Sequence, residues 1–155
     1  MARRQYRLTQ FARRSEIRDS KEHIVASVSH ANQSRVVIRA TGERFSVARS
    51  GNQIKENGET PIARASFSGV YDLLGQDATL QWKPLSFWHG VFGWSHADGT
   101  VVMRYVPAGC GKYLVIVEQP AFNELRLVAL GAYFLKLTGT DFVAWSAVAA
   151  SINIV

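Results

Sequence analysis

The only cysteine of the chain, Cys110, lies in the sequence Gly109-Cys-Gly-Lys112. A catalytic thiol needs a neighbouring base and an electropositive setting, because the thiolate is the nucleophile. Lys112 supplies a positive charge, but the flanking glycines are more typical of a hairpin turn. A phosphate-binding loop requires G-x-x-x-x-G-K followed by Ser or Thr, and here Val106 occupies the first glycine position and Tyr113 follows the lysine. We therefore expect a turn and not an active site.

The histidines form two pairs, His23 with His30 and His89 with His96, and the members of each pair are seven residues apart. On an uninterrupted strand an odd spacing places two side chains on opposite faces. Neither pair is therefore expected to form a metal site alone, and the thiolates of a structural zinc site are missing. We expect no bound metal.

Other catalytic patterns are also absent from the sequence. The twelve carboxylates are scattered along the chain, and Ser68 lacks the leading glycine of a G-x-S-x-G nucleophile turn. There is no glycine-rich dinucleotide fingerprint. The sequence therefore favours a protein that is not an enzyme and has no cofactor.

Basic residues are concentrated at the N-terminus of this chain of net charge +6. Residues 1–21 contain seven basic and two acidic residues, a net charge of +5. Such a patch attracts the phosphates of lipids or nucleic acids. The predicted ligand-binding residues are Arg3, Arg4, Arg7, Arg13 and Arg14, and the predicted ligand is an anionic phospholipid headgroup. The alternative is that these charges protect the exposed edge of a sheet from association.

Five aromatic residues lie close together in the segment QWKPLSFWHGVFGW: Trp82, Phe87, Trp88, Phe92 and Trp94. Exposed on a sheet, they would stack on nucleotides or sit at a lipid interface, so a nucleic-acid-binding module that uses the N-terminal arginines is the alternative function. We favour instead a packing role, in which Trp88, Phe92 and Trp94 face a central helix.

Most of the first 118 residues alternate between apolar and polar side chains, with turn signals between the alternating segments. The segments include Ile24 to Ser29, Arg35 to Arg39, Ile62 to Ser68, Thr79 to Lys83, Phe87 to Ser95 and Val101 to Val106. Asp98-Gly99 is the sharpest turn signal, because this pair suits a type I′ hairpin. A spacing of about 8–12 residues is typical of an antiparallel sandwich or barrel.

The chain ends in a long apolar segment. Leu127, Leu130, Phe134 and Leu137 recur at helical spacing, and a weaker polar stripe is formed by Arg126, Ala129, Tyr133 and Lys136. We predict a central helix over about 121–138, which starts at the N-cap Asn123 and ends at Gly139, and a second short helix over about 141–151. Lys136 and Asp141 interrupt the apolar run, so a buried helix is favoured over a transmembrane anchor.

A series of hairpins followed by an apolar helix resembles the tubby C-terminal-like superfamily, which includes LURP-one-related proteins and phospholipid scramblases. The resemblance rests on RFSVA (44–48) with GETPIARA (58–65), on WSHADGTVVMRY (94–105) and on LRLVALGAYFLKL (125–137). It implies a barrel of about twelve strands around an apolar helix. Members of the superfamily bind phosphoinositides or other membrane lipids, or have no known activity, so the resemblance implies fold more than function.

We therefore expect residues 1–155 to form one domain of mainly β class. Its strands, over about 4–118, form a closed or nearly closed antiparallel barrel of about ten to twelve strands around a hydrophobic C-terminal helix. The lone cysteine and the lack of an apolar leader point to a cytoplasmic protein, with peripheral membrane attachment as a variant of this location. The expected function is a non-enzymatic binding or scaffold module.

Overall fold

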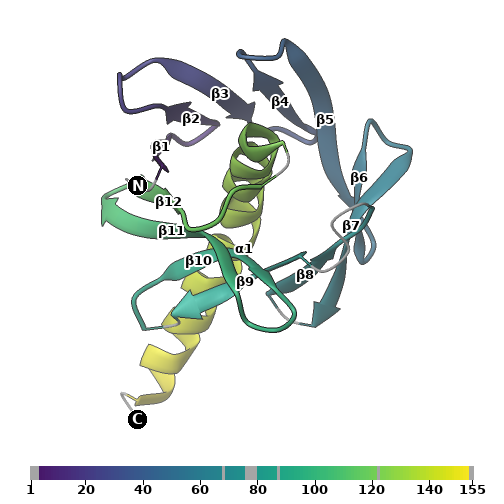
Figure 1. The fold of residues 1–155 in the computed structure, drawn as a ribbon. Coiled ribbons are helices and arrows are strands. Elements are labelled where there is room, and N and C mark those ends of the chain that lie inside the picture. The colour runs from purple at the N-terminus through teal and green to yellow at the C-terminus, as the bar shows by residue number, and fades with distance from the viewer. Residues whose placement is uncertain (1–3, 68, 76–79, 87, 122, 154–155) are drawn as a thin grey trace.

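The computed structural model describes residues 4–67, 69–75, 80–86, 88–121 and 123–153. Twelve strands close into an antiparallel barrel, and one C-terminal helix runs through it (Figure 1), which confirms the predicted fold class. The strands are β1 (Arg4–Gln10), β2 (Arg14–Arg18), β3 (Ile24–Ser29), β4 (Ser34–Ile38), β5 (Glu43–Ser50), β6 (Gln53–Glu56), β7 (Thr60–Phe67), β8 (Val70–Leu73), β9 (Leu80–Ser86), β10 (Val91–His96), β11 (Val101–Gly109) and β12 (Lys112–Val117), and the helix is α1 (Glu124–Asn153).

Each strand pairs with its neighbours in the chain, and β1 pairs with β12 to close the ring. In the closing pair Tyr6 lies opposite Val115. A closed barrel leaves no strand edge exposed to solvent. The interpretation of the N-terminal arginines as protection of a sheet edge is therefore wrong, because β1 and β2 are paired on both sides.

Glycine correctly marks the position of two turns, but the predicted turn type is wrong for one of them. Asn57 and Gly58 both have positive φ values, 53° and 75°, as a type I′ turn requires. In the Asp98-Gly99 turn only Gly99 has a positive φ, 94°, and the Asp98 carboxylate accepts a hydrogen bond from the Thr100 N–H at 2.9 Å. The turn is thus in the predicted place, but its type is not I′.

The interior of the barrel is filled by α1. Every residue from Leu127 to Leu135 is buried, including Ala129 and Tyr133, which we assigned to a polar stripe. That assignment was wrong because the barrel surrounds the helix, and a helix enclosed on all sides buries its whole circumference.

Aromatic side chains from the barrel wall surround Phe134 of α1. Its ring centroid lies 5.1 Å from that of Tyr71, 5.5 Å from that of Trp94 and 6.0 Å from that of Trp82. The Trp82 indole N–H donates a hydrogen bond to the Thr138 hydroxyl at 3.2 Å, and the Thr138 hydroxyl donates to the Phe134 carbonyl at 2.7 Å. The buried Trp82 indole N–H and the buried Thr138 hydroxyl are therefore both hydrogen-bonded to the helix.

Gly131 allows the helix to pass close to the barrel wall. A Cβ atom at this position would lie 1.9 Å from the Tyr105 hydroxyl oxygen. The Tyr105 hydroxyl donates to the Val128 carbonyl at 2.9 Å, and the Trp94 indole N–H donates to the Leu127 carbonyl at 3.0 Å. These bonds fix α1 along its axis relative to β10 and β11.

The structure differs from the prediction in the course of the helix and in the start of one strand, and it agrees on the residue that precedes the helix. The backbone of α1 is one continuous helix to Asn153, so the break at Gly139 and the separate helix over 141–151 are wrong. Asn123 does precede the helix, and its carbonyl accepts the first helical bond from the Leu127 N–H at 3.1 Å. The strand expected at Phe87 to Ser95 begins only at Val91, because a turn that includes Gly90, with φ 65°, comes before it.

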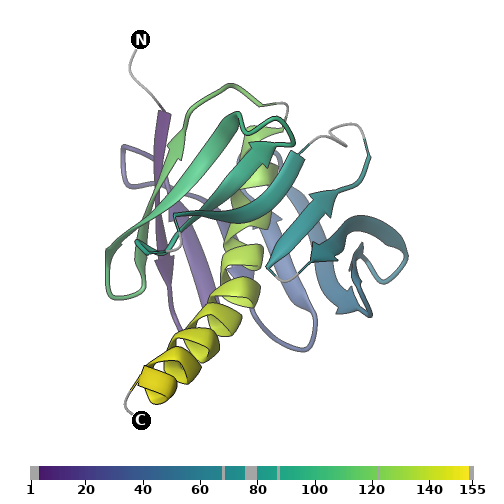
Figure 2. The ribbon, with the colours of Figure 1, turned by 90° about the horizontal axis from the view of Figure 1, so that it is seen from below.

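Because the strands alternate in direction, alternate turns lie at the same end of the barrel. The α1 helix begins at one end, beside Arg4 of β1, and leaves through the other end (Figure 2). No helix within the described residues is long and apolar enough to span a bilayer.

Candidate ligand-binding face

The two ends of the barrel differ in charge. We call the end where α1 begins the acidic end, because its connections carry the carboxylates Asp19, Glu22, Glu59, Asp98 and Glu118. We call the end where α1 leaves the basic end. Its turns lie over residues 11–13, 30–33, 51–52, 88–90 and 110–111, with Gly69 between β7 and β8, and none of these described residues is acidic.

Basic side chains gather at the basic end from separate parts of the chain. They lie in the first turn, at the start of β2, near the end of β5, at the start of β12 and on α1: Arg13, Arg14, Arg49, Lys112 and Lys136. Among the residues that the structure describes, Arg14 is the one of these five that contacts a carboxylate, that of Glu16 at 3.4 Å. Arg13, Arg49 and Lys112 have no carboxylate contact within that part of the chain, so they are available for an external anion.

Two large apolar side chains are exposed at this same end. Phe11 in the turn between β1 and β2 is 52% exposed, and Trp88 in the turn between β9 and β10 is 89% exposed. Within the described part of the chain these are the exposed large apolar residues. Tryptophan is enriched at protein and membrane interfaces, because its ring favours an environment that is part apolar and part aqueous.

The structure separates the five arginines predicted to bind an anionic ligand. Arg3 lies outside the described residues. Arg4 lies at the acidic end and forms an ion pair with Glu124 at 2.8 Å, and Arg7 on the outer wall is paired with Glu22. Only Arg13 and Arg14 lie at the basic end. The predicted group is therefore not one patch, because β1 runs from one end of the barrel to the other.

At the acidic end, carboxylates neutralise the cations. Glu124 accepts hydrogen bonds from Arg4 and, at 2.6 Å, from the Tyr6 hydroxyl. Burial and the Glu124 carboxylate raise the pKa of Tyr6 to about 12. Arg126 pairs with Glu56 at 2.6 Å and stacks 4.2 Å from the centre of the Phe45 ring. These contacts hold the start of α1 in the barrel, so their role is structural.

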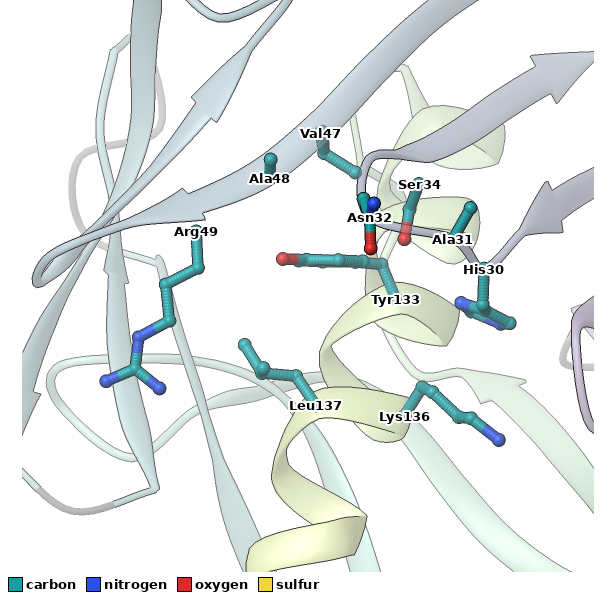
Figure 3. Close-up of a pocket in the computed structure, with 10 residues that line it drawn as sticks. All are labelled: His30, Ala31, Asn32, Ser34, Val47, Ala48, Arg49, Tyr133, Lys136 and Leu137. Carbon is teal, nitrogen blue, oxygen red and sulfur yellow. The ribbon is translucent and has the colours of Figure 1, made fainter.

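A pocket of about 430 Å³ opens at the basic end, between α1, the turn after β3 and the end of β5 (Figure 3). Its lining residues are His30, Ala31, Asn32, Ser34, Val47, Ala48, Arg49, Tyr133, Lys136 and Leu137. None of them is acidic. This volume is within the range of small-molecule sites, roughly 300–1,000 Å³.

The hydroxyl groups of two pocket residues, Tyr133 and Ser34, form no hydrogen bond with any described residue. The two residues are only 7% and 6% exposed, but their hydroxyl oxygens are not among the fully buried unpaired atoms, so they keep some exposure. Burial raises the pKa of Tyr133 to about 12, while the Arg49 charge acts in the opposite direction. The Tyr133 hydroxyl is therefore a protonated donor at neutral pH.

Cys110 and His30 are the remaining candidate groups from the sequence. Cys110 is free and exposed in its turn. His30 Nε2 and the Ser15 hydroxyl oxygen lie 2.8 Å apart in a hydrogen bond, and burial together with the Lys136 charge lowers the His30 pKa. Within the described residues no three His, Cys, Asp or Glu side chains lie close enough to share a metal ion.

Sequence reasoning missed Phe11, Arg49 and Tyr133 as surface or pocket residues. A signal for the basic end was nevertheless present. In a barrel of consecutive hairpins, every second turn lies at the same end, and counting charges over alternate turns would have separated an acidic set from a set without carboxylates. Tyr133 gave no such signal, because its place on the polar stripe of the helix does not show that its hydroxyl lines a pocket.

Comparison with models of known protein families, with curated proteins and with solved structures finds no match for this chain.

Proposed function

We propose that this protein is a non-enzymatic binding module that attaches to anionic phospholipid surfaces through the basic end of its barrel. The observation that carries the proposal is the separation of charge between the two ends, with Phe11 and Trp88 exposed at the end whose described turns lack carboxylates. The proposal keeps Arg13 and Arg14 from the sequence prediction. It replaces the other predicted arginines with Arg49, Lys112 and Lys136.

The arrangement matches the requirements of a lipid interface. Basic side chains close to an anionic membrane contribute about 1 kcal/mol each, and tryptophan is favoured at the level of the headgroups. An anionic membrane would repel the acidic end of the barrel, so the protein is attracted to the membrane only when its basic end faces the lipid. We further propose a cytoplasmic location, where the membrane leaflet is anionic.

We also propose that the chain belongs to the tubby C-terminal-like superfamily, in the sense of a LURP-one-related or scramblase-like barrel. Support for this comes from the order of twelve strands followed by an enclosed apolar helix, which is the arrangement that the resemblance implied. Membrane-lipid binding by members of the superfamily agrees with the basic end.

Co-sedimentation with vesicles of phosphatidylcholine, with and without phosphatidylserine, tests the proposal. The variant Arg13→Gln/Arg14→Gln removes two charges from the basic end, and a loss of about 2 kcal/mol corresponds to roughly 30-fold weaker binding. The matched control is Arg39→Gln/Arg44→Gln. These arginines are equally exposed, but they lie at or near the acidic end, so binding should be unchanged.

Trp88→Ala separates the apolar contribution from the charge contribution. We expect weaker binding to the anionic vesicles with the same dependence on salt, because the tryptophan carries no charge. Equal binding to neutral and anionic vesicles, or equal losses in the two double-arginine variants, would contradict the proposal.

The alternative, a nucleic-acid-binding module, lost one of its proposed stacking residues because Trp82 is fully buried. Trp88 remains exposed. If single-stranded DNA quenches tryptophan fluorescence with a steep dependence on salt while vesicles do not bind, the nucleic-acid function replaces the lipid function.

A further inference from the structure

The pocket at the basic end has features of a small-molecule site that are separate from a flat lipid surface. It is concave, none of its lining residues is acidic, and the hydroxyl groups of two largely buried residues, Tyr133 and Ser34, line it without hydrogen bonds to described residues. Hydroxyl groups that line an open pocket without a protein partner are available to water or to a ligand.

Two donors of the pocket, the Tyr133 hydroxyl and Arg49, lie on the same side of it. Figure 3 shows the Tyr133 hydroxyl directed toward the side of Arg49, whereas Lys136 extends to the opposite side of the pocket. Arg49 Nε donates to the Gly51 carbonyl at 3.1 Å, which fixes the side chain to its own turn. The terminal nitrogens of Arg49 make no hydrogen bond with the residues that the structure describes, so the planar end of the guanidinium is available.

This geometry favours a particular type of anion. A guanidinium group binds a carboxylate through two parallel hydrogen bonds, and a neighbouring hydroxyl adds a third donor. A phosphate dianion would require several converging cations, but Arg49 and Lys136 diverge. The surface between these donors is apolar and is formed by Val47, Ala48 and Leu137.

We propose that this pocket binds a small organic monocarboxylate, with the carboxylate on Arg49 and the Tyr133 hydroxyl and an apolar chain against Leu137 and Val47. The inference does not depend on the lipid-binding function, because its ligand is a dissolved molecule and its contacts lie inside the pocket. Its volume of about 430 Å³ accommodates a chain of several carbon atoms.

Isothermal titration calorimetry of the full chain with octanoate, below its micelle concentration, tests the proposal. Octanol and octylammonium have the same chain without the carboxylate, acetate has the carboxylate without the chain, and inorganic phosphate is the competing class of anion. We expect octanoate to bind most tightly of these five probes. Tighter binding of phosphate, or equal binding of octanol, octylammonium or acetate, would overturn the assignment.

Two variants test the assigned donors. Arg49→Gln is expected to weaken octanoate binding by about tenfold or more, and Tyr133→Phe by about two- to tenfold, in line with charged and neutral hydrogen bonds. Arg35→Gln is the matched control, because Arg35 is an exposed arginine near the same end but does not line this pocket. Unchanged thermal unfolding identifies variants that are folded, and Tyr133→Phe keeps the ring that packs on Phe134.

The result also separates the two proposals. Octanoate binding that is equal in the original protein and in folded Arg49→Gln and Tyr133→Phe overturns the pocket assignment. A protein that binds anionic vesicles but not octanoate overturns this inference alone. A protein that binds octanoate through Arg49 but shows no preference for anionic vesicles overturns the lipid-binding function and leaves the pocket in place.

Discussion

Replacing Gly131 with alanine is expected to destabilise the protein, although alanine is the better helix former. The added Cβ atom would lie 1.9 Å from the Tyr105 hydroxyl oxygen and 2.3 Å from the ring carbon that carries it. Contacts this short cannot persist, so either the helix or the Tyr105 ring must shift. Both movements disturb the bond from the Tyr105 hydroxyl to the Val128 carbonyl.

The magnitude follows from three contributions. Overpacking a core costs about 1–3 kcal/mol, and a buried hydroxyl that loses its partner costs about 1–3 kcal/mol. Alanine recovers about 1 kcal/mol of helix propensity relative to glycine. The free energy of unfolding should therefore fall by about 1–5 kcal/mol.

Urea unfolding followed by tryptophan fluorescence measures this change, because Trp82 and Trp94 are fully buried and become exposed on unfolding. The midpoint should fall for Gly131→Ala with little change in slope. A Gly131→Ala variant as stable as the original protein would refute the close packing of α1 against Tyr105.

Three further predictions concern the core. Burial is the main cause that raises the pKa values of Tyr6 and Tyr133 to about 12, so the folded state favours the neutral phenols. The contribution of these two groups to the free energy of unfolding is therefore complete below pH about 10 and is lost between about pH 10 and 12. The free energy of unfolding and the phenolate absorbance should change together over that range. Thr138→Val leaves the Trp82 indole N–H without its acceptor and should lower the free energy of unfolding by about 1–3 kcal/mol in urea titrations, whereas a neutral effect would argue against this bond. A chain that ends at Gln119 lacks α1 and should be insoluble when expressed without detergent; a soluble truncation with cooperative unfolding would contradict the role of the helix as core.

The fold could be predicted from the sequence because its signals are local and repeated. Alternating strands, turn residues at regular intervals and one long apolar tail leave few arrangements other than a filled barrel. The errors have physical causes. A turn between Phe87 and Val91 was hidden because its residues include Trp88, a residue that is typical of strands.

The candidate site was harder to predict because it depends on which chain segments meet. Arg4 and Arg14 are close in the sequence, but β1 separates them by about 20 Å at its rise of roughly 3.3 Å per residue. Arg49 and Lys136 are distant in the sequence, yet they line one pocket. Charge along the chain therefore indicates that the protein has a basic surface, but not which basic side chains come together on it.

The position of the core helix has a consequence for biosynthesis. All twelve strands precede α1 in the chain, and β1 must also wait for β12 before the ring can close. At about 5–20 residues per second, a ribosome needs roughly 6–24 s to pass from β1 to α1. Throughout that interval the nascent strands have apolar inner faces and no partner to cover them. Slow translation between these two elements should therefore increase aggregation of the newly made chain, and chaperones that bind extended apolar segments should act mainly before α1 emerges.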